Sequence, residues 1–81
     1  MASATAVTVR AAFKGRAQNE AAAIVRRWLR ILGESHDTID RLHRQVEEIG
    51  AEELSVPLGK ARNELREAFI IVFVAWRRLQ P

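Results

Sequence analysis

The sequence contains no cysteine, so it has no disulfide framework, no thiolate metal site and no thiol nucleophile. This absence agrees with the reducing cytoplasm, which is the location we expect. Long hydrophobic runs are also lacking. The longest, residues 68–76, has nine residues and falls well short of the ~18–20 that a membrane span needs, so we expect no transmembrane span.

A strong charge of one sign is absent as well. Thirteen Lys and Arg residues stand against ten Asp and Glu residues, which leaves a net charge of +3, and the basic residues are scattered along the chain. This balance permits contact with nucleic acid or anionic lipid without requiring it. Residues 1–18 include no acidic residue, a composition shared with organelle transit peptides, so an organelle location is the alternative.

The familiar catalytic motifs are missing. The chain has no Gly-x-Ser-x-Gly elbow, no phosphate-binding loop and no His-Glu-x-x-His pattern. We therefore expect a protein that is not an enzyme and holds no cofactor. An enzyme or metal-binding protein built within a helical bundle stays open as an alternative, because such a site can combine residues that are distant in sequence.

The spacing of apolar residues predicts an all-α fold. Three helices are expected over residues 18–32, 37–49 and 58–79, because apolar residues recur at intervals of three and four in each. Gly33 and Gly50 are predicted to end the first two, and Pro57 to begin the third. We thus expect a small antiparallel three-helix bundle over residues 18–81, preceded by an N-terminal arm over residues 1–17.

Two segments leave alternatives open. Residues 7–14 alternate between apolar and polar side chains, as a short strand does, but residues from Ala11 onward can equally begin a helix. Residues 69–74 are rich in β-branched and aromatic side chains, which favours a strand, although the helix-forming residues around them agree better with a helix.

The nine-residue apolar run predicts a contact surface. In a helix, the seam of the third segment leaves Ile70, Ile71 and Val74 on another face, and two shorter helices cannot cover both faces. We expect a homodimer whose contacts include these three residues and Phe73. The first functional hypothesis is therefore a non-catalytic protein-protein interaction module that assembles with a second copy of itself.

The second hypothesis is a small basic regulator that binds DNA or RNA. Arginines adjoin Trp28 and Trp76, both at seam positions, and this combination suits phosphate contact. The segment Thr8-Val9-Arg10, followed by two helical segments joined through Gly33-Glu34-Ser35, resembles the ribbon-helix-helix family. That resemblance implies a dimer whose paired N-terminal strands enter the major groove. The predicted nucleic-acid contacts are Arg10, Lys14, Arg16, Arg26, Arg27 and Arg30.

A metal site is the third hypothesis. His36, Asp40, His43 and Glu47 follow one another at intervals of four, three and four, so they project from nearly one line along a helix. Imidazole and carboxylate groups one turn apart can share Zn or a similar ion. The alternative is a solvated flank on which His36 pairs with Asp40 and His43 pairs with Glu47.

Overall fold

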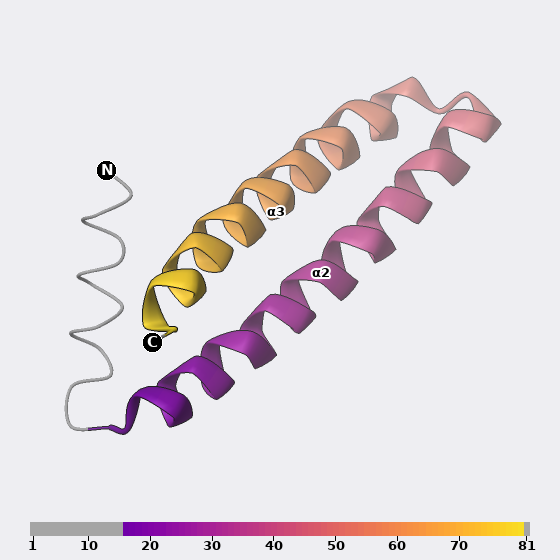
Figure 1. The fold of residues 1–81 in the computed structure, drawn as a ribbon. Helices are drawn as coiled ribbons and strands as arrows, with labels where there is room; N and C mark the ends of the chain where they lie inside the picture. Colours follow the sequence, from indigo (N-terminus) through magenta and orange to yellow (C-terminus); the bar gives the residue numbers. More distant parts are fainter. Residues whose placement is uncertain (1–15, 81) are drawn as a thin grey trace.

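The computed structural model describes residues 16–80, and these residues form a long helical hairpin (Figure 1). Helix α2 spans Gln18–Ile49 and helix α3 spans Glu52–Leu79. The helices run antiparallel, so the start of α2 and the end of α3 lie together at the open end of the hairpin (Figure 1). The all-α prediction is confirmed, but the prediction of three helices is wrong.

The two helices predicted over residues 18–32 and 37–49 are one continuous helix. Gly33 does not end it: its backbone stays helical, and the residue is partly buried beside the ring of Phe69 on α3. Ser35 and Asp37, residue types that often cap the start of a helix, lie within this one, and the Thr38 hydroxyl donates to the Glu34 carbonyl at 2.9 Å. The apolar seam that faces α3 passes through this segment without a break, and burying that seam outweighs the ~1 kcal/mol that an internal glycine costs.

Gly50 ends α2, as predicted. It adopts a left-handed conformation with φ of 82°, and its N–H donates to the carbonyls of Val46 and Glu47. The N–H of Ala51 donates to the Val46 carbonyl at 3.2 Å. These bonds form a Schellman motif, which satisfies the last carbonyls of the helix and reverses the chain within two residues.

Helix α3 begins five residues before the predicted start at Pro57. Glu52 and Glu53 occupy its first turn, where negative side chains interact favourably with the helix dipole. Pro57 is the sixth residue of the helix and removes one backbone bond, to the carbonyl of Glu53. Both residues are exposed, so this turn of the helix is open to solvent.

The core is small and lies between the two helices. Among residues 16–80, six apolar side chains are buried: Ala21, Val25, Leu29, Val46, Ala75 and Leu79. Val72 and Trp76 of α3 pack against the buried group at the open end. There the side-chain amide of Gln18 donates to the carbonyl of Leu79, which joins the first turn of α2 to the last turn of α3.

The remaining structural predictions concern strands and membrane spans. Residues 69–74 are helical, which confirms the helix over the strand, and residues 16–80 contain no strand. The question of strand or helix over residues 7–14 lies outside the described residues. In the part of the chain that the structure describes, neither helix is long and apolar enough to cross a membrane.

Candidate interaction face and buried polar cluster

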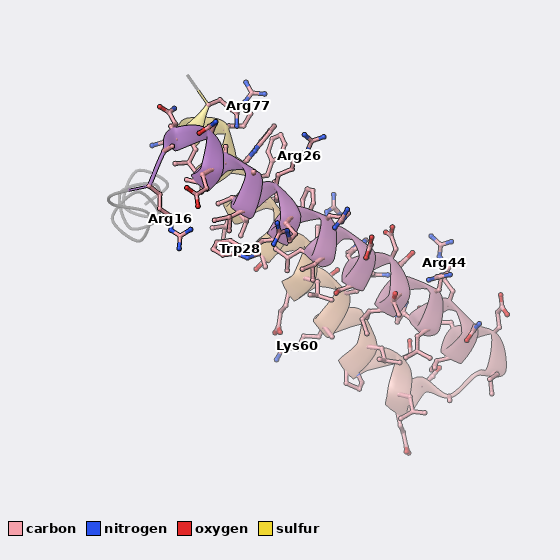
Figure 2. All side chains as sticks on the ribbon, turned by 90° about the horizontal axis from the view of Figure 1, so that it is seen from below. Arg16, Arg26, Trp28, Arg44, Lys60 and Arg77 are labelled. Carbon is pink, nitrogen blue, oxygen red and sulfur yellow. The ribbon has the colours of Figure 1, made fainter. Side chains whose placement is uncertain are left out.

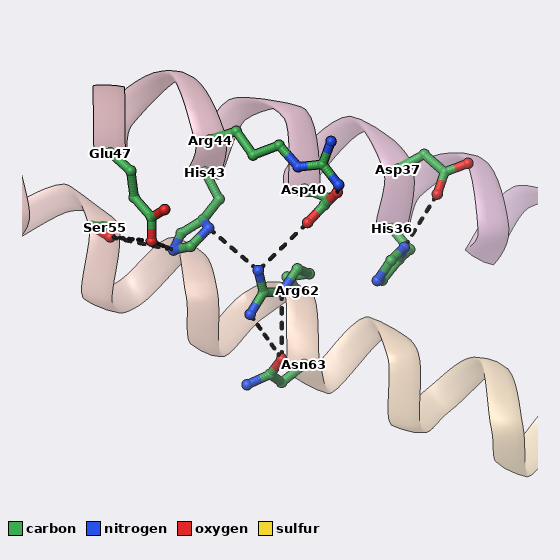
Figure 3. Close-up of polar contacts among 9 residues, drawn as sticks. All are labelled: His36, Asp37, Asp40, His43, Arg44, Glu47, Ser55, Arg62 and Asn63. Carbon is green, nitrogen blue, oxygen red and sulfur yellow. Dashed lines mark hydrogen bonds and ion pairs between the residues drawn. The ribbon is translucent and has the colours of Figure 1, made fainter. Parts of the chain in front are cut away.

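A buried histidine lies between the helices near the turn. His43 of α2 is only 8% exposed and meets Gly59 of α3, which has no side chain to occupy the space of the imidazole ring. Its Nδ1 lies 3.3 Å from the guanidinium of Arg62, and its Nε2 lies 3.1 Å from Glu47 and 3.2 Å from the hydroxyl of Ser55 (Figure 3). His43 therefore contacts polar groups from both helices.

The contact with Arg62 determines how His43 is hydrogen-bonded. A guanidinium can only donate, so Nδ1 accepts and the neutral ring carries its proton on Nε2. Nε2–H then points toward the carboxylate of Glu47 and the hydroxyl of Ser55. A histidine that activates a serine needs the opposite arrangement, with a carboxylate at Nδ1 and a free Nε2. Ser55 and His43 are consequently not arranged as a nucleophile and its base.

Asp40 extends the cluster along the hairpin. Its carboxylate lies 2.8 Å from Arg44 and 3.4 Å from Arg62, so Arg62 connects Asp40 to His43 across the two helices (Figure 3). Within residues 16–80, no buried side-chain nitrogen or oxygen lacks a hydrogen-bond partner. Such a fully paired polar cluster favours one alignment of α2 with α3, because a slip would leave charged groups unpaired.

The residues predicted as metal ligands do not lie as one group. His43 pairs with Glu47, as the alternative predicted, but it is buried and not on a solvated flank. His36 pairs with its neighbour Asp37 at 3.2 Å, and Asp40 contacts arginines (Figure 3). Over the described residues, no three His, Asp or Glu side chains are grouped as metal ligands would be.

One broad side of the hairpin, which we call the polar side, combines charged residues with aromatic rings. Shallow hollows on it are lined by residues of both helices: Arg26 lies with Trp76 in one, and Asp37 lies with Arg66 and Phe69 in the other. These residues define the polar side.

The opposite side is apolar along α2, whereas α3 adds the exposed charged residues Lys60 (Figure 2) and Glu64 there. Trp28 lies two residues beyond Arg26, and Ile71 lies two residues beyond Phe69, which is about 200° around each helix. Figure 2 shows Trp28 and Arg26 projecting to different sides of α2. Five exposed side chains form what we call the apolar face: Trp28 (45% exposed), Ile31 (52%), Leu42 (41%), Ile49 (80%) and Ile71 (52%).

The four residues predicted to form an interface occupy several faces of α3. Ile70 and Ile71 are each 52% exposed, Phe73 is 38% exposed and Val74 is partly buried. On the polar side, the ring of Phe73 stacks with that of Phe69, with centroids 6.3 Å apart, and lies tilted against that of Trp76, with centroids 5.8 Å apart. Only Ile71 lies on the apolar face, because Ile70 and Val74 point away from α2.

The hairpin gathers basic residues that are scattered in sequence. Arg16 and Arg26 of the predicted nucleic-acid set lie toward the open end, where α3 adds Arg77 (Figure 2). Arg27 and Arg30 belong to the same half of α2, and Arg78 follows Arg77. A hollow lined by Ala23 lies among Arg26, Arg27 and Arg30. Arg10 and Lys14 lie outside the described residues.

Sequence reasoning missed three contributors. Trp28 was expected in the core but is 45% exposed, and α2 supplies most of the apolar face. Arg62 and Ser55 of the polar cluster were not predicted. The available signal was that Arg62 falls four residues after Leu58 and three before Leu65, so that a charged residue occupies the seam facing α2.

Comparison of the chain with protein-family models, with characterised proteins and with solved structures gives no significant match.

Proposed function

We propose that this protein is a non-catalytic assembly module, a helical hairpin that pairs with a second copy through its apolar face. The observation that supports this most directly is the line of exposed apolar residues along α2. It runs from Trp28 to Ile49, a length of about 32 Å, and Ile71 of α3 lies on the same side. Several exposed apolar side chains along one side of a small protein commonly mark an interaction site.

The size of the core favours a partner. Six buried apolar side chains are few for two helices of 32 and 28 residues. A core of this kind rarely supplies more than ~3–5 kcal/mol, and small domains often gain the remainder by oligomerisation. The apolar face covers roughly 600 Å² per copy if it is two helices wide, which approaches the ~800 Å² per partner of a standard interface.

A second copy is the simplest occupant, because a face that pairs with itself forms a closed, two-fold dimer. In this proposal the four helices form one bundle with the apolar face at its centre. The face departs from the predicted one in using Trp28, Ile31, Leu42 and Ile49 of α2 in addition to Ile71 of the C-terminal helix. The polar cluster around His43 holds α2 and α3 in the alignment that forms the apolar face.

Light scattering tests the proposal. The wild-type protein should have twice the 9.2 kDa mass of one chain at micromolar concentration. Ile31→Lys should give monomers, because the dimer would bury two lysines without partners. Ile70→Lys is the matched control, since Ile70 is equally exposed but points away from the apolar face. A wild-type monomer would contradict the proposal.

A second candidate function rests on the gathering of arginines toward the open end. Those lining the hollow beside Ala23 suit contact with the phosphates of a nucleic acid. In a filter-binding assay, Arg26→Gln, Arg27→Gln and Arg30→Gln combined should weaken binding and lower the salt slope by about 3. Each of the three single variants is compared with Arg41→Gln, which also removes one charge from α2. Absence of binding at low salt would contradict this candidate.

A further inference from the structure

The two ends of the hairpin carry opposite charge. Residues 16–31 and 70–80 hold six arginines and a single acidic residue, Glu20, whose carboxylate lies 2.9 Å from Arg16. At the turn, residues 45–59 hold four glutamates and no basic residue. The hairpin thus has a basic open end and an acidic turn end.

This asymmetry distinguishes the two ways in which a two-fold dimer can use the apolar face. If the axis runs along the helices, both basic open ends lie together and both acidic turns lie together. If the axis crosses the helices, each open end lies beside the partner's turn. Like charges at an interface oppose association and opposite charges favour it, so the second arrangement is electrostatically complementary.

We propose that the second copy binds inverted, on a two-fold axis that crosses the hairpin beside Ser35. This inference rests on the proposed function, and it adds the orientation and register of the partner. In α2, Trp28, Ser35, Leu42 and Ile49 recur at intervals of seven, so they share the apolar side. Ser35 lies within two residues of the middle of Gln18–Ile49, where the axis must pass if two inverted copies overlap along their whole length.

The residues of α3 that lie opposite Ser35 indicate the same position for the two-fold axis. The close approaches of Gly33 to Phe69 and of Gly59 to His43 show that residues 67–68 lie opposite Ser35. Ala68 lies there, three residues before Ile71 and therefore on the apolar side. Ala61, seven residues before it, is partly exposed like Ala68. Small side chains at these two positions let two inverted α3 helices approach closely.

The resulting dimer matches large groups on α2. Around an axis at Ser35, Trp28 faces the partner's Leu42, seven residues on the other side of the axis. The basic open end of each copy points toward the acidic turn end of the other. Overlap and charge therefore favour the same axis.

Single cysteines test the orientation, because the natural chain has none. Ser35→Cys and Ala68→Cys should each form a disulfide-linked homodimer on mild oxidation, since residues on the axis meet their own copies. The rate should exceed that of Glu34→Cys, the exposed neighbour, by roughly 100-fold at micromolar protein, because paired thiols meet at about millimolar effective concentration. Circular dichroism of the reduced variants checks that each keeps its helices.

A mixture of the Ser35→Cys and Ala68→Cys proteins separates the orientations. The inverted dimer yields linked homodimers of each variant. Preferential linkage of Ser35→Cys to Ala68→Cys would show the axis along the helices and overturn the inference while leaving the proposed assembly intact. A particle of dimer mass whose thiols do not link would also overturn it, whereas a wild-type monomer contradicts the proposed function itself.

Discussion

The guanidinium of Arg62 on α3 lies 3.3 Å from Nδ1 of His43 on α2, and this contact joins the two helices near the turn. Arg62 also reaches Asp40, so one arginine connects a buried imidazole with a carboxylate one turn away. The groups have no such partners if α2 slips along α3. The hairpin therefore presents the two helices, and with them the apolar face, in one alignment.

His43→Leu should lower the free energy of unfolding by about 1–3 kcal/mol, because Arg62 and Ser55 lose a partner in a partly buried site. His43→Leu combined with Arg62→Leu should recover part of this loss, since a leucine pair of suitable shape leaves fewer charged groups unpaired. Urea unfolding at one fixed protein concentration measures both. Additive losses in the double variant would contradict the coupling.

Gly59→Ala should fail to stabilise the protein, although alanine is the better helix former. A Cβ at this position would lie 3.2 Å from Nε2 of His43, and the ring is held by contacts at both nitrogens. Combined with His43→Ala, the same change should become stabilising by about 0.5–1 kcal/mol. An equal effect of Gly59→Ala in both backgrounds, measured by thermal unfolding, would show that the ring does not need this space.

Gly50 and Gly33 should respond oppositely to alanine. Gly50→Ala should cost about 1–2 kcal/mol, because φ of 82° strains any side chain, even though a Cβ there meets nothing within 4 Å. Gly33→Ala should stabilise by about 0.5–1 kcal/mol, since the position is helical and its Cβ would lie in ordinary contact with Phe69 at 3.7 Å. Chemical unfolding of the two variants compares them, and a loss at Gly33 equal to that at Gly50 would be the contrary result.

Trp28 should report assembly. Its indole is 45% exposed on the single hairpin, so pairing of the apolar faces would remove it from water. In a Trp76→Phe background, Trp28 emission should shift to longer wavelength on dilution as dimers separate. Emission that does not change with concentration, while the mass falls from dimer to monomer, would place Trp28 outside the interface.

Much of the helix pattern was predictable because apolar spacing is a local property. Gly50 ends α2 as expected because no seam residue follows it before the chain reverses. Gly33 misleads because the same residue type, followed by the cap-forming Ser35, lies within a seam that continues into Val46. Whether such a glycine ends a helix depends on the opposing helix, here on Phe69, which local sequence does not contain.

Only part of the candidate site could be predicted from the sequence, because the missing part also depends on how the helices pack. The exposure of Ile70 and Ile71 could be predicted from their distance from the apolar seam. The prediction assumed three helices, however, so it placed the apolar residues of α2 in the core and not on the surface. With two helices, one side of α2 is uncovered, and Trp28 and Ile31 become surface residues. The number of helices therefore decides which apolar residues are left for a partner.

The central claim is that the apolar face pairs with a second copy, and neighbouring residues on α3 test it most directly. Ile71 and Ile70 are the same residue type with the same exposed fraction, but only Ile71 lies on the apolar face. Sedimentation equilibrium of Ile71→Lys, Ile70→Lys and wild type compares them under one set of conditions.

Wild type and Ile70→Lys should sediment as dimers of the 9.2 kDa chain, whereas Ile71→Lys should raise the dissociation constant by ~100-fold or more, because the dimer would bury two charges. A wild-type monomer, or a dimer that Ile70→Lys disrupts and Ile71→Lys does not, would contradict the account.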